Sequence, residues 1–333
     1  MKIVVTGGAG FIGSHYVRSV ILGRYPTFAD ADVLVLDALT YAGSLDNLTP
    51  VANSPRLTFV KGDICDHEVV AEALTGADVV VHFAAESHVD RSISGAEGFV
   101  RTNVLGTQVL LESARVAAVP RFLHVSTDEV YGSIASGSWP ETHPVSPNSP
   151  YSASKASSDL LALAYNRTYG MNITVTRCSN NYGPYQFPEK VIPLFVSNLL
   201  DGLSVPLYGD GQNVRDWLHV DDHCHGIQLA LEGGRAGEIY NIGGGTELSN
   251  RRLTELLLDA CGADWSGVRL VEDRLGHDRR YSVDISKISR ELGYAPRVDF
   301  ATGLAETVAW YRDNRTWWEP LKSRAALPAP GAR

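Results

Sequence analysis

Cysteine pairs, long apolar runs and an excess of positive charge are all missing from this sequence. Its four cysteines stand far apart, at positions 65, 178, 224 and 261, and no two form a CxxC pair. This spacing excludes a zinc site built on cysteine pairs and gives no disulfide framework, so we expect reduced thiols in the core or lining a site. No apolar run is long enough to span a membrane, which predicts no membrane partner. The chain begins directly with a strand pattern, so we expect no signal peptide and a cytoplasmic location.

The charge balance is acidic. Lysine and arginine total 29 against 38 aspartates and glutamates, a formal net charge of −9. This balance argues against nucleic acid as the main partner, although local cations can still bind an anionic small molecule. Apolar residues make up 44% of the 333 positions, which is enough for a large core in one large or two modest domains. We predict no metal site.

A glycine-rich turn follows the first predicted strand. Lys2–Thr6 is a short β-rich run, and the helix pattern of Phe11–Leu22 begins within the sequence GGAGFIG. Strand, glycine turn and helix in this order are the setting of a dinucleotide fingerprint. Gly7 would allow the tight turn, Gly10 would let the backbone approach a pyrophosphate, and Gly13 would let the helix pack on the strand. A turn of this kind is by itself as often structural as functional, so the residues of the following strands must distinguish a dinucleotide site from a structural turn.

Acidic residues end the next two predicted strands. Asp37 follows Val33–Leu36, where a carboxylate can bind both ribose hydroxyls and so favours NAD over NADP. The alternative, a solvated loop acid, fits that setting less well. Asp63 follows the strand Leu57–Val60 and could accept a hydrogen bond from an adenine amino group, or it could equally cap the helix expected from about His67. Together with the glycine turn, these residues predict an NAD site.

The fourth predicted strand, Val79–Phe83, leads into two alanines that would let the backbone pass close to a flat cofactor. The polar loop after them, Glu86–Ser92, resembles part of a site more than a spacer, although Asp90 and Arg91 could pair only with each other. A helix pattern then runs over Gly98–Ala118.

Two adjacent carboxyl groups, Asp128 and Glu129, follow the predicted strand Arg121–Ser126 and Thr127. They stand at the carboxyl edge of the strand, where ligands bind in open α/β sheets. Two adjacent anions repel each other in a buried pocket, so the pair should keep one proton; the sequence does not say which residue holds it. The alternative is a turn pair without a chemical role.

A tyrosine and a lysine stand four residues apart after a proline-spaced loop. Tyr151 and Lys155 share one face of a helix expected to run to about Tyr169 and to end at Gly170. A cation beside a tyrosine favours the phenolate, so Tyr151 is predicted to act as a base near neutral pH. Alone, the two would more often be a surface pair, but the glycine turn upstream favours a site. A base and two carboxyl groups together predict several proton transfers on one substrate.

Strands and helices alternate up to the strand Ile173–Thr176, and the second half is richer in turns. This order predicts an α/β fold, with a Rossmann-type doubly wound parallel sheet and a smaller C-terminal substrate domain. We place the NAD-binding domain at 1–181 with a returning segment at about 215–243, the substrate domain at about 182–214 and 244–322, and a disordered tail at 323–333. In the second half we expect helices over 191–200, 251–261 and 304–311 and strands over 206–208, 215–220 and 238–242.

With these motifs placed, the chain resembles the extended short-chain dehydrogenase/reductase superfamily and, within it, the dTDP-glucose 4,6-dehydratases, from Thr6 to about Trp318. The specific part is the acidic pair together with the tyrosine–lysine pair, since epimerases of the superfamily usually have a small hydroxyl residue and no acidic pair there. The sequences AAESHVD from Ala84 and NNYGPYQ from Asn180 also match. One departure is Leu275, where many members have proline; it removes no reactive group.

The resemblance implies NAD-dependent dehydration of dTDP-glucose to dTDP-4-keto-6-deoxyglucose, a hydro-lyase reaction that feeds deoxysugar biosynthesis. Tyr151 would take the proton of the 4-hydroxyl while C4 gives hydride to NAD, with Lys155 stabilising the phenolate and Thr127 bound to the same oxygen. Glu129 would remove the C5 proton and Asp128 would protonate the leaving 6-hydroxyl. Hydride would then return to C6 from a cofactor that never leaves.

The resemblance also implies binding residues. Those for NAD are Gly7, Gly10, Phe11, Ile12, Gly13, Asp37, Leu39, Thr40, Asp63, Ile64, Phe83, Ala84, Ala85, Ser87, Thr102, Tyr151, Lys155 and Asn181. Those for the substrate are Ser87, Thr127, Glu129, Asn180, Lys190, Val191, Pro206, Leu207, Tyr208, Arg215, Asn250, Arg274, His277 and Tyr281. Arg215 and Arg274 are the strongest candidates for the diphosphate, although each could be a surface charge. His277 could pair only with Asp278, and Tyr240 is expected in the core.

Members of this family typically form homodimers through the helices that correspond to 105–117 and 152–164, and the resemblance implies the same here. The apolar residues within 160–164 fit such an interface but would equally fit packing on the sheet. Two rival functions stay open. A nucleotide-sugar 4-epimerase would lose no water, and a catalytically silent dinucleotide sensor would need neither the tyrosine–lysine pair nor the acidic pair.

Overall fold

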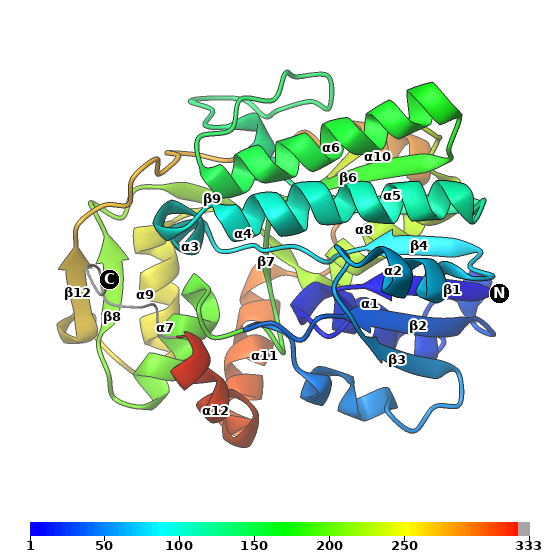
Figure 1. The fold of residues 1–333 in the computed structure, drawn as a ribbon. Helices are drawn as coiled ribbons and strands as arrows, with labels where there is room; N and C mark the ends of the chain where they lie inside the picture. Colours follow the sequence, from blue (N-terminus) through cyan, green and yellow to red (C-terminus); the bar gives the residue numbers. More distant parts are fainter. Residues whose placement is uncertain (326–333) are drawn as a thin grey trace.

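The computed structural model of the chain describes residues 1–325. Its largest element is a seven-stranded sheet with the strand order β10-β6-β5-β4-β1-β2-β3, in which all neighbours are parallel (Figure 1). The strands are β1 (Lys2–Thr6), β2 (Asp32–Asp37), β3 (Leu57–Lys61), β4 (Val79–His82), β5 (Arg121–Thr127), β6 (Ile173–Cys178) and β10 (Ile239–Ile242). Strand order reverses beside β1, as in doubly wound sheets, so the predicted Rossmann-type α/β fold is confirmed.

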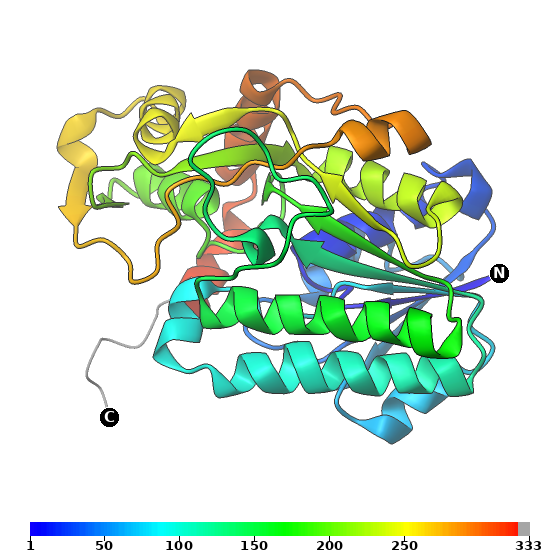
Figure 2. The ribbon, with the colours of Figure 1, turned by 90° about the horizontal axis from the view of Figure 1, so that it is seen from above.

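Helices cover both faces of this sheet. One face carries α1 (Phe11–Ile21) and α8 (Val220–Gly233), and the other carries α2 (His67–Leu74), α5 (Thr107–Val116) and α6 (Pro150–Tyr169). Seen from above, α5 and α6 lie side by side along the outside of the sheet (Figure 2). Along β1, Ile3 and Val5 enter the core under α1 and α8 while Val4 enters the core under α2 and α5. A strand buried on both faces therefore reads as a continuous apolar run.

The smaller part of the molecule contains two short sheets and four helices. The sheets are β11 (Glu247–Ser249), β9 (Val214–His219) and β7 (Asn180–Tyr182), and β12 (Val268–Val271) with β8 (Val205–Tyr208). The helices are α7 (Val191–Leu200), α9 (Asn250–Cys261), α11 (Phe300–Asp313) and α12 (Arg315–Ala325). Together they enclose a core in which Tyr311 and Trp318 are fully buried.

The chain leaves the large sheet after β6 and later returns to it. β9 pairs with β7 and β11, whereas the next elements, α8 and β10, belong to the large sheet. The predicted returning segment 215–243 therefore joins the large sheet from α8 onward. The division into two domains stays a prediction. Of the predicted tail 323–333, the first three residues end α12 and the others lie outside the described residues.

Several elements differ from the sequence-based expectation. Helix α8 is not among the predicted elements; its first turn contains Asp221 and Asp222, and acidic residues there stabilise the positive end of a helix. The helix predicted over 98–118 is instead α4 (Glu97–Phe99), a π-helical segment (Val100–Gly106) and α5. Unexpected short helices are α3 (Val89–Ser94) and α10 (Ser286–Leu292), and 3-10 turns lie at Pro26–Phe28, Leu45–Val51, Asp128–Tyr131 and Trp265–Gly267.

Helix α6 is fixed at both ends by local signals. Ser149 caps its first turn in a reciprocal capping box with Ser152, and Pro150 occupies the first helical position. At the other end Gly170 is left-handed, with φ of 69°, which confirms the predicted stop. Because the start of α6 is fixed so firmly, the side chains of its first two turns point reproducibly at the end of the sheet.

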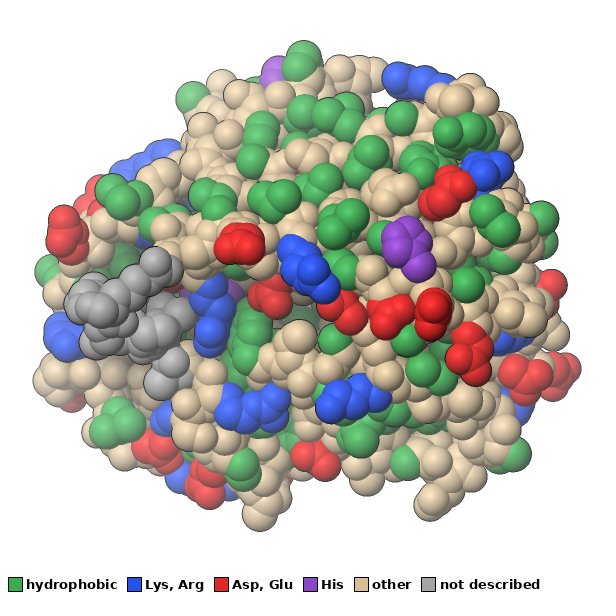
Figure 3. All heavy atoms as spheres, in the orientation of Figure 1, with side chains coloured by type: hydrophobic (Ala, Val, Ile, Leu, Met, Phe, Trp, Pro, Cys, Tyr) green, Lys and Arg blue, Asp and Glu red, His purple; other side chains and the backbone are tan. Residues whose placement is uncertain are grey.

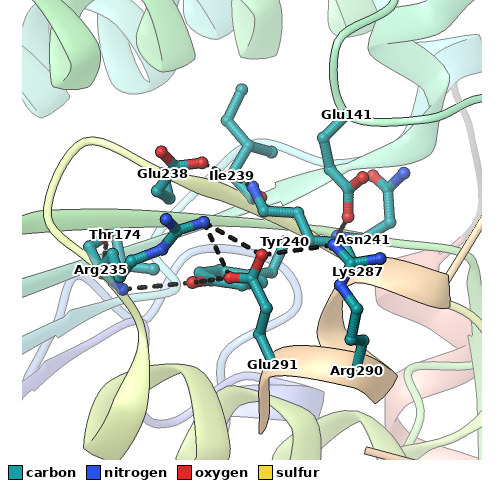
Figure 4. Close-up of polar contacts among 10 residues, drawn as sticks. All are labelled: Glu141, Thr174, Arg235, Glu238, Ile239, Tyr240, Asn241, Lys287, Arg290 and Glu291. Carbon is teal, nitrogen blue, oxygen red and sulfur yellow. Dashed lines mark hydrogen bonds and ion pairs between the residues drawn. The ribbon is translucent and has the colours of Figure 1, made fainter.

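Strand β10 is an edge of the large sheet, and side chains close it. The Glu141 carboxylate accepts a hydrogen bond from the Asn241 backbone N–H at 2.9 Å (Figure 4). Nearby, Glu291 on α10 binds the Arg235 guanidinium and accepts a hydrogen bond from the Tyr240 hydroxyl. Covered in this way, the strand offers less unpaired backbone to another chain. Tyr240 is fully buried here, in the core as predicted.

Candidate active site

A cleft of about 760 Å³ follows the carboxyl edge of the large sheet and reaches into the smaller part of the molecule. Its lining extends from the glycine turn after β1 to the segment 274–281. Figure 3 shows part of it as a hollow bordered by acidic and basic side chains. The cleft lies where ligands bind in doubly wound sheets, outside the carboxyl ends of the strands.

The glycine turn forms one end of the cleft, and its three glycines serve different purposes. Gly7 has φ of +70°, and a Cβ there would lie 2.6 Å from the Ala84 nitrogen; a Cβ on Gly13 would lie 2.3 Å from the Gly7 oxygen. These two glycines are required by the packing of the turn itself. A Cβ on Gly10 would meet only the Gly7 oxygen, at 3.3 Å. Gly10 therefore leaves an open approach to the backbone on the cleft side.

Asp37 ends β2 at the same part of the cleft. Its carboxylate accepts hydrogen bonds from the backbone N–H groups of Ala9 at 2.9 Å and Leu39 at 2.8 Å. The residue is buried, and burial raises the pKa of the carboxyl group while the two backbone N–H groups oppose that shift. The alternative of a solvated loop acid is thus wrong. Leu39 itself does not line the cleft; its contribution is the backbone N–H that orients Asp37.

Asp63 lines the cleft after β3 and does not cap α2. The cap is Asp66, which accepts hydrogen bonds from the first turn of that helix. Asp63 instead accepts a hydrogen bond from the Cys65 backbone N–H at 2.9 Å and lies 3.4 Å from the Arg101 guanidinium. The interpretation of Asp63 as a helix cap is therefore wrong, and its contact with adenine stays a prediction.

The predicted binding residues fall into two groups. Leu39 does not line the cleft, and Leu207 is buried away from it beneath Gly211. The others that line it are Phe11, Ile12, Thr40, Ile64, Phe83, Ala84, Ala85, Ser87, Thr102, Asn180, Asn181, Lys190, Val191, Pro206, Tyr208, Arg215, Asn250, Arg274, His277 and Tyr281. Lining the cleft fixes where these side chains are; their ligands stay predictions.

The catalytic candidates meet in the middle of the cleft. Strand β5 ends at Thr127, whose hydroxyl accepts a hydrogen bond from the Glu129 backbone N–H and lies 3.3 Å from an Asp128 carboxyl oxygen. Tyr151 and Lys155 reach the same space from the first two turns of α6, and all five side chains line the cleft. The two segments, 22 or more positions apart in sequence, are brought together by the packing of α6 against β5.

The two carboxyl groups have different environments. Burial, the adjacent Glu129 charge and Asp216 raise the pKa of Asp128 well above its usual value. Burial also raises the pKa of Glu129, but the cations Arg274, Lys190 and Arg215 oppose that shift. The proton that the pair retains therefore belongs on Asp128. The geometry thus selects the protonation order that the sequence alone left open.

Burial shifts the pKa of both Tyr151 and Lys155. The Lys155 ammonium donates a hydrogen bond to the Val125 carbonyl at 2.8 Å, and burial lowers its pKa to about 8. Burial, with Glu129 and Cys178, raises the pKa of Tyr151 well above its usual value. Because burial raises the pKa of this phenol, the role of Tyr151 as a base near neutral pH stays a prediction.

The cations of the smaller part are held by local contacts. The buried Arg215 guanidinium lies 4.2 Å from the centre of the Tyr281 ring and donates to the Asp278 carbonyl. The Lys190 ammonium donates to the Ser87 carbonyl at 2.6 Å, across the cleft. Arg274 lies 3.7 Å from an Asp90 carboxyl oxygen. All three cations face the cleft and can bind a diphosphate.

Two predicted pairings are wrong. His277 lies 2.6 Å from Asp273 and does not pair with Asp278, whose carboxylate accepts from the Tyr281 hydroxyl. Arg91 does not pair with Asp90; its Nε donates to the carboxylate of another residue, Glu189, at 3.0 Å. The partner of His277 lies only four positions before it, whereas the partner of Arg91 lies 98 positions after it.

A model of the GDP-mannose 4,6 dehydratase family matches residues 4–307. The chain belongs to this family. Among similar 4,6-dehydratases, the dTDP-glucose 4,6-dehydratases of Streptomyces niveus and Streptomyces antibioticus are 61% and 63% identical over 332 and 337 residues; the matches cover 99% and 100% of this chain and 99% of each relative.

Solved structures give the same picture. The dTDP-glucose 4,6-dehydratase DesIV of Streptomyces venezuelae, a structure with NAD bound, is 66% identical with a TM-score of 0.96, covering 96% of this chain and 100% of that one. A UDP-glucose 4-epimerase of Thermotoga maritima is 34% identical with a TM-score of 0.87, covering 95% and 100%. The dehydratase and epimerase folds are therefore alike, and the side chains in the cleft have to distinguish them.

Sequence reasoning missed one buried group in the cleft of this dehydratase. The Glu189 side chain is only 4% exposed, and it accepts hydrogen bonds from the Tyr41 hydroxyl at 2.9 Å and from Arg91. The Arg91 guanidinium also lies 4.0 Å from the centre of the Tyr41 ring. The group joins the loop after β2, helix α3 and the segment before α7. Its members are 98 or more positions from Glu189, so no local pattern could have found it.

The retained proton on Asp128 makes a prediction about stability. The folded dehydratase holds a proton that the unfolded chain releases above about pH 4, so this residue destabilises the fold increasingly as the pH rises. We expect Asp128→Asn to remove that cost. The melting temperature of the variant should equal that of the parent near pH 4 and exceed it increasingly up to neutral pH, while activity is lost. Asp32→Asn, an exposed change, serves as control; a difference that is flat with pH would contradict the retained proton.

No membrane-spanning candidate is found among the helices of residues 1–325. Within the same residues, no three histidine, cysteine, aspartate or glutamate side chains are grouped so that they could hold a metal ion.

Proposed function

We propose that this dehydratase is a dTDP-glucose 4,6-dehydratase, a hydro-lyase that uses tightly bound NAD to form dTDP-4-keto-6-deoxyglucose for deoxysugar biosynthesis. The observation that carries the proposal is the convergence of Asp128, Glu129 and Tyr151 in one cleft with the glycine turn. An epimerase needs the tyrosine but has no elimination for an acidic pair to catalyse. The relatives that carry this name match along almost the whole chain.

The residues of the cleft fit NAD. Gly10 leaves its backbone open to a pyrophosphate, and the oriented Asp37 carboxylate stands at the end of β2, where it can accept from both ribose hydroxyls. When bound, NAD would supply the acceptor for hydride from C4 of the sugar, the donor of hydride to C6 and a positive charge on its oxidised ring. A positive charge near the phenol favours the phenolate and therefore opposes the rise in the pKa of Tyr151 that burial causes. The cofactor site supports NAD over NADP because an acid, not a cation, stands at the ribose position.

The first half of the reaction is an oxidation at C4, assisted by three side chains. Tyr151 takes the proton of the 4-hydroxyl, and Thr127 hydrogen-bonds the same oxygen. Lys155, held by the Val125 carbonyl, stabilises the phenolate. The resulting 4-ketone makes the C5 proton acidic, which prepares the elimination.

The second half is the loss of water across C5 and C6. Glu129, whose charge is supported by three nearby cations, takes the C5 proton. Asp128, which keeps its own proton because it is buried beside that charge, donates it to the departing 6-hydroxyl. Glu129 later returns a proton to C5 when hydride arrives at C6. Two carboxyl groups with different pKa values therefore act as base and acid on neighbouring carbons.

The nucleotide half of the substrate is assigned to the smaller part. Arg215, Arg274 and Lys190 supply the positive charge for a diphosphate, and the rings of Tyr208 and Tyr281 line the same region. The assignment of dTDP over UDP rests on the likeness to the named relatives. Competition between dTDP-glucose and UDP-glucose, followed by mass analysis of the products, tests both carrier and reaction.

That experiment separates the candidate functions. A dTDP sugar lighter than its substrate by one water supports the dehydratase, and a product of unchanged mass indicates an epimerase. Deuterium placed at C4 of the substrate should reappear at C6 without exchange with solvent, because the hydride stays on a captive cofactor. Absence of turnover on both sugars, with NAD bound, would favour a dinucleotide sensor.

We also propose that two copies of the chain form a homodimer through α5 and α6. Leu161 and Leu163 pack on the core of the large sheet, but Leu160 on α6 is 57% exposed, and Leu105, in the π-helical segment before α5, is 45% exposed. Sedimentation of the purified protein should give the mass of two chains, and Leu160→Glu should shift it toward one. A monomeric parent protein would contradict the proposal.

We also propose a cytoplasmic location, which the four free cysteines support, because thiols stay reduced there.

A further inference from the structure

A buried polar cluster lies behind the catalytic lysine, and none of the chemistry above uses it. It consists of Asp159 on α6, His124 on β5 and Arg177 on β6. Asp159 and His124 are 0% exposed and Arg177 2%. Asp159 accepts a hydrogen bond from Arg177 Nε at 2.9 Å and lies 3.3 Å from His124 Nε2. Charged groups are seldom buried this fully without a reason, because desolvation is expensive.

The geometry connects this cluster to the active site. Asp159 stands one helical turn after Lys155 on the same face of α6, so both side chains point at the same strands. Lys155 is buried too, and its hydrogen-bond acceptor is a carbonyl oxygen, which carries no full charge. The space between α6 and the sheet thus contains two cations, Lys155 and Arg177, and one carboxylate, that of Asp159. The Coulomb attraction of that carboxylate is what compensates the buried ammonium.

The neighbouring strands add no second anion there. His82 on β4 lies between the hydroxyls of Thr6 at 2.7 Å and Thr107 at 3.0 Å, and its ring lies 5.3 Å from that of His124. Burial lowers the pKa of both histidines, so both are neutral at ordinary pH. The titratable and charged groups facing Lys155 and Asp159 are Tyr151 on α6, His82 on β4, His124 on β5, Arg177 and Cys178 on β6, and Tyr131 in the 3-10 turn after β5, whose ring lies 4.6 Å from the Arg177 guanidinium.

We propose that Asp159 is a positioning residue that keeps Lys155 protonated and directed at the phenol of Tyr151, with Arg177 and His124 fixing the carboxylate in turn. The proposal rests on the proposed function, in which a charged Lys155 stabilises the phenolate. Asp159 does not touch the substrate; it acts through the lysine. The directions of the two pKa shifts agree: burial raises the pKa of Asp159, but Arg177 and His124 outweigh it and hold it at about 2, while burial lowers that of Lys155 and Asp159 opposes this.

The test is the pH profile of kcat in two variants that change the local charge in opposite senses. Asp159→Asn removes the anion, so Lys155 should lose its proton at lower pH, and the alkaline fall of kcat should move down by about 1 pH unit. Arg177→Met removes the competing cation and frees the carboxylate for the lysine. Its alkaline fall should move up by a similar amount. A structural role for the cluster would lower stability in both variants without moving the profiles apart.

A matched control is Asp222→Asn, another buried carboxylate, on α8, which accepts a hydrogen bond from the Val298 backbone N–H at 3.0 Å and does not line the cleft. It should lose stability and keep the parental pH profile. Circular dichroism and thermal melts show whether each variant is folded; if Asp159→Asn is not, Arg177→Met alone carries the test. Profiles that coincide with an active parent overturn this inference, whereas a parent inactive on dTDP-glucose overturns the proposed function instead.

Discussion

Turnover of dTDP-glucose should fall by about 10²–10⁴-fold when Tyr151 is replaced by phenylalanine, because general base catalysis contributes an effect of this size. The phenol is buried in the cleft beside Thr127 and Lys155, and phenylalanine preserves its ring while removing the group that takes the 4-hydroxyl proton. Oxidation at C4 is the first chemical step, so the reaction should stop before any reduced cofactor forms. The measurement is kcat by product mass analysis, together with the near-ultraviolet absorbance of the bound nicotinamide.

Tyr294→Phe is the matched control for this substitution. Tyr294 is also buried, and its hydroxyl donates a hydrogen bond to the Gly243 carbonyl at 3.0 Å, away from the cleft. Loss of that hydrogen bond should cost about 1 kcal/mol of stability and leave kcat unchanged. Normal turnover in Tyr151→Phe would show that another group removes the proton, and the role assigned to this tyrosine would be wrong.

Replacing Glu129 with glutamine should give an equally large loss by a different route. The oxidation at C4 does not need Glu129, but the C5 proton then has no base, so the elimination stalls. We expect turnover to fall by about 10²–10⁴-fold while the bound nicotinamide stays reduced, a state visible in its absorbance. The sugar bound at that point, a 4-ketone that keeps its 6-hydroxyl, is heavier than the product by one oxygen atom, because two hydrogens have already left it in the oxidation at C4. Glutamine keeps the shape of the side chain, and the loss therefore reports the missing base.

Glu141→Gln provides the comparison. Glu141 is also a partly buried carboxylate that accepts a backbone hydrogen bond, but it closes the edge of β10 and does not line the cleft. The amide oxygen of glutamine can accept the same hydrogen bond, so turnover should be unaffected. If the Glu129 variant turns over normally, or stalls with the nicotinamide oxidised, the assignment of Glu129 to the C5 proton is contradicted.

The features that sequence reasoning could predict depend on local rules. The glycine turn, the left-handed stop at Gly170 and the helix Val191–Leu200 each follow from residues within a few positions of one another. Asp37 could be placed because strand, turn and helix fix where a second strand must end. The convergence of Asp128, Glu129 and Tyr151 was predicted from the family resemblance, which rests on two short motifs, each made of residues close together in sequence.

What could not be predicted depends on contacts between distant positions. Arg91 had a plausible partner next to it in Asp90, yet it binds Glu189, 98 positions away. The pKa of the Tyr151 phenol is raised mainly by burial, which depends on how α6 packs and not on the residues next to it in sequence. Asp159 gives no sign in the sequence of being charged and buried. Such contacts are set by tertiary packing, which a residue pattern does not record.

The distribution of the catalytic and binding groups has a consequence for how such enzymes diversify. The groups proposed to move protons lie on one short turn after β5 and the first two turns of α6, whereas the cations proposed to bind the diphosphate come from separate segments near Lys190, Arg215 and Arg274. Substitutions in the segments of the smaller part can therefore change which carrier nucleotide is bound while the catalytic turn after β5 is retained.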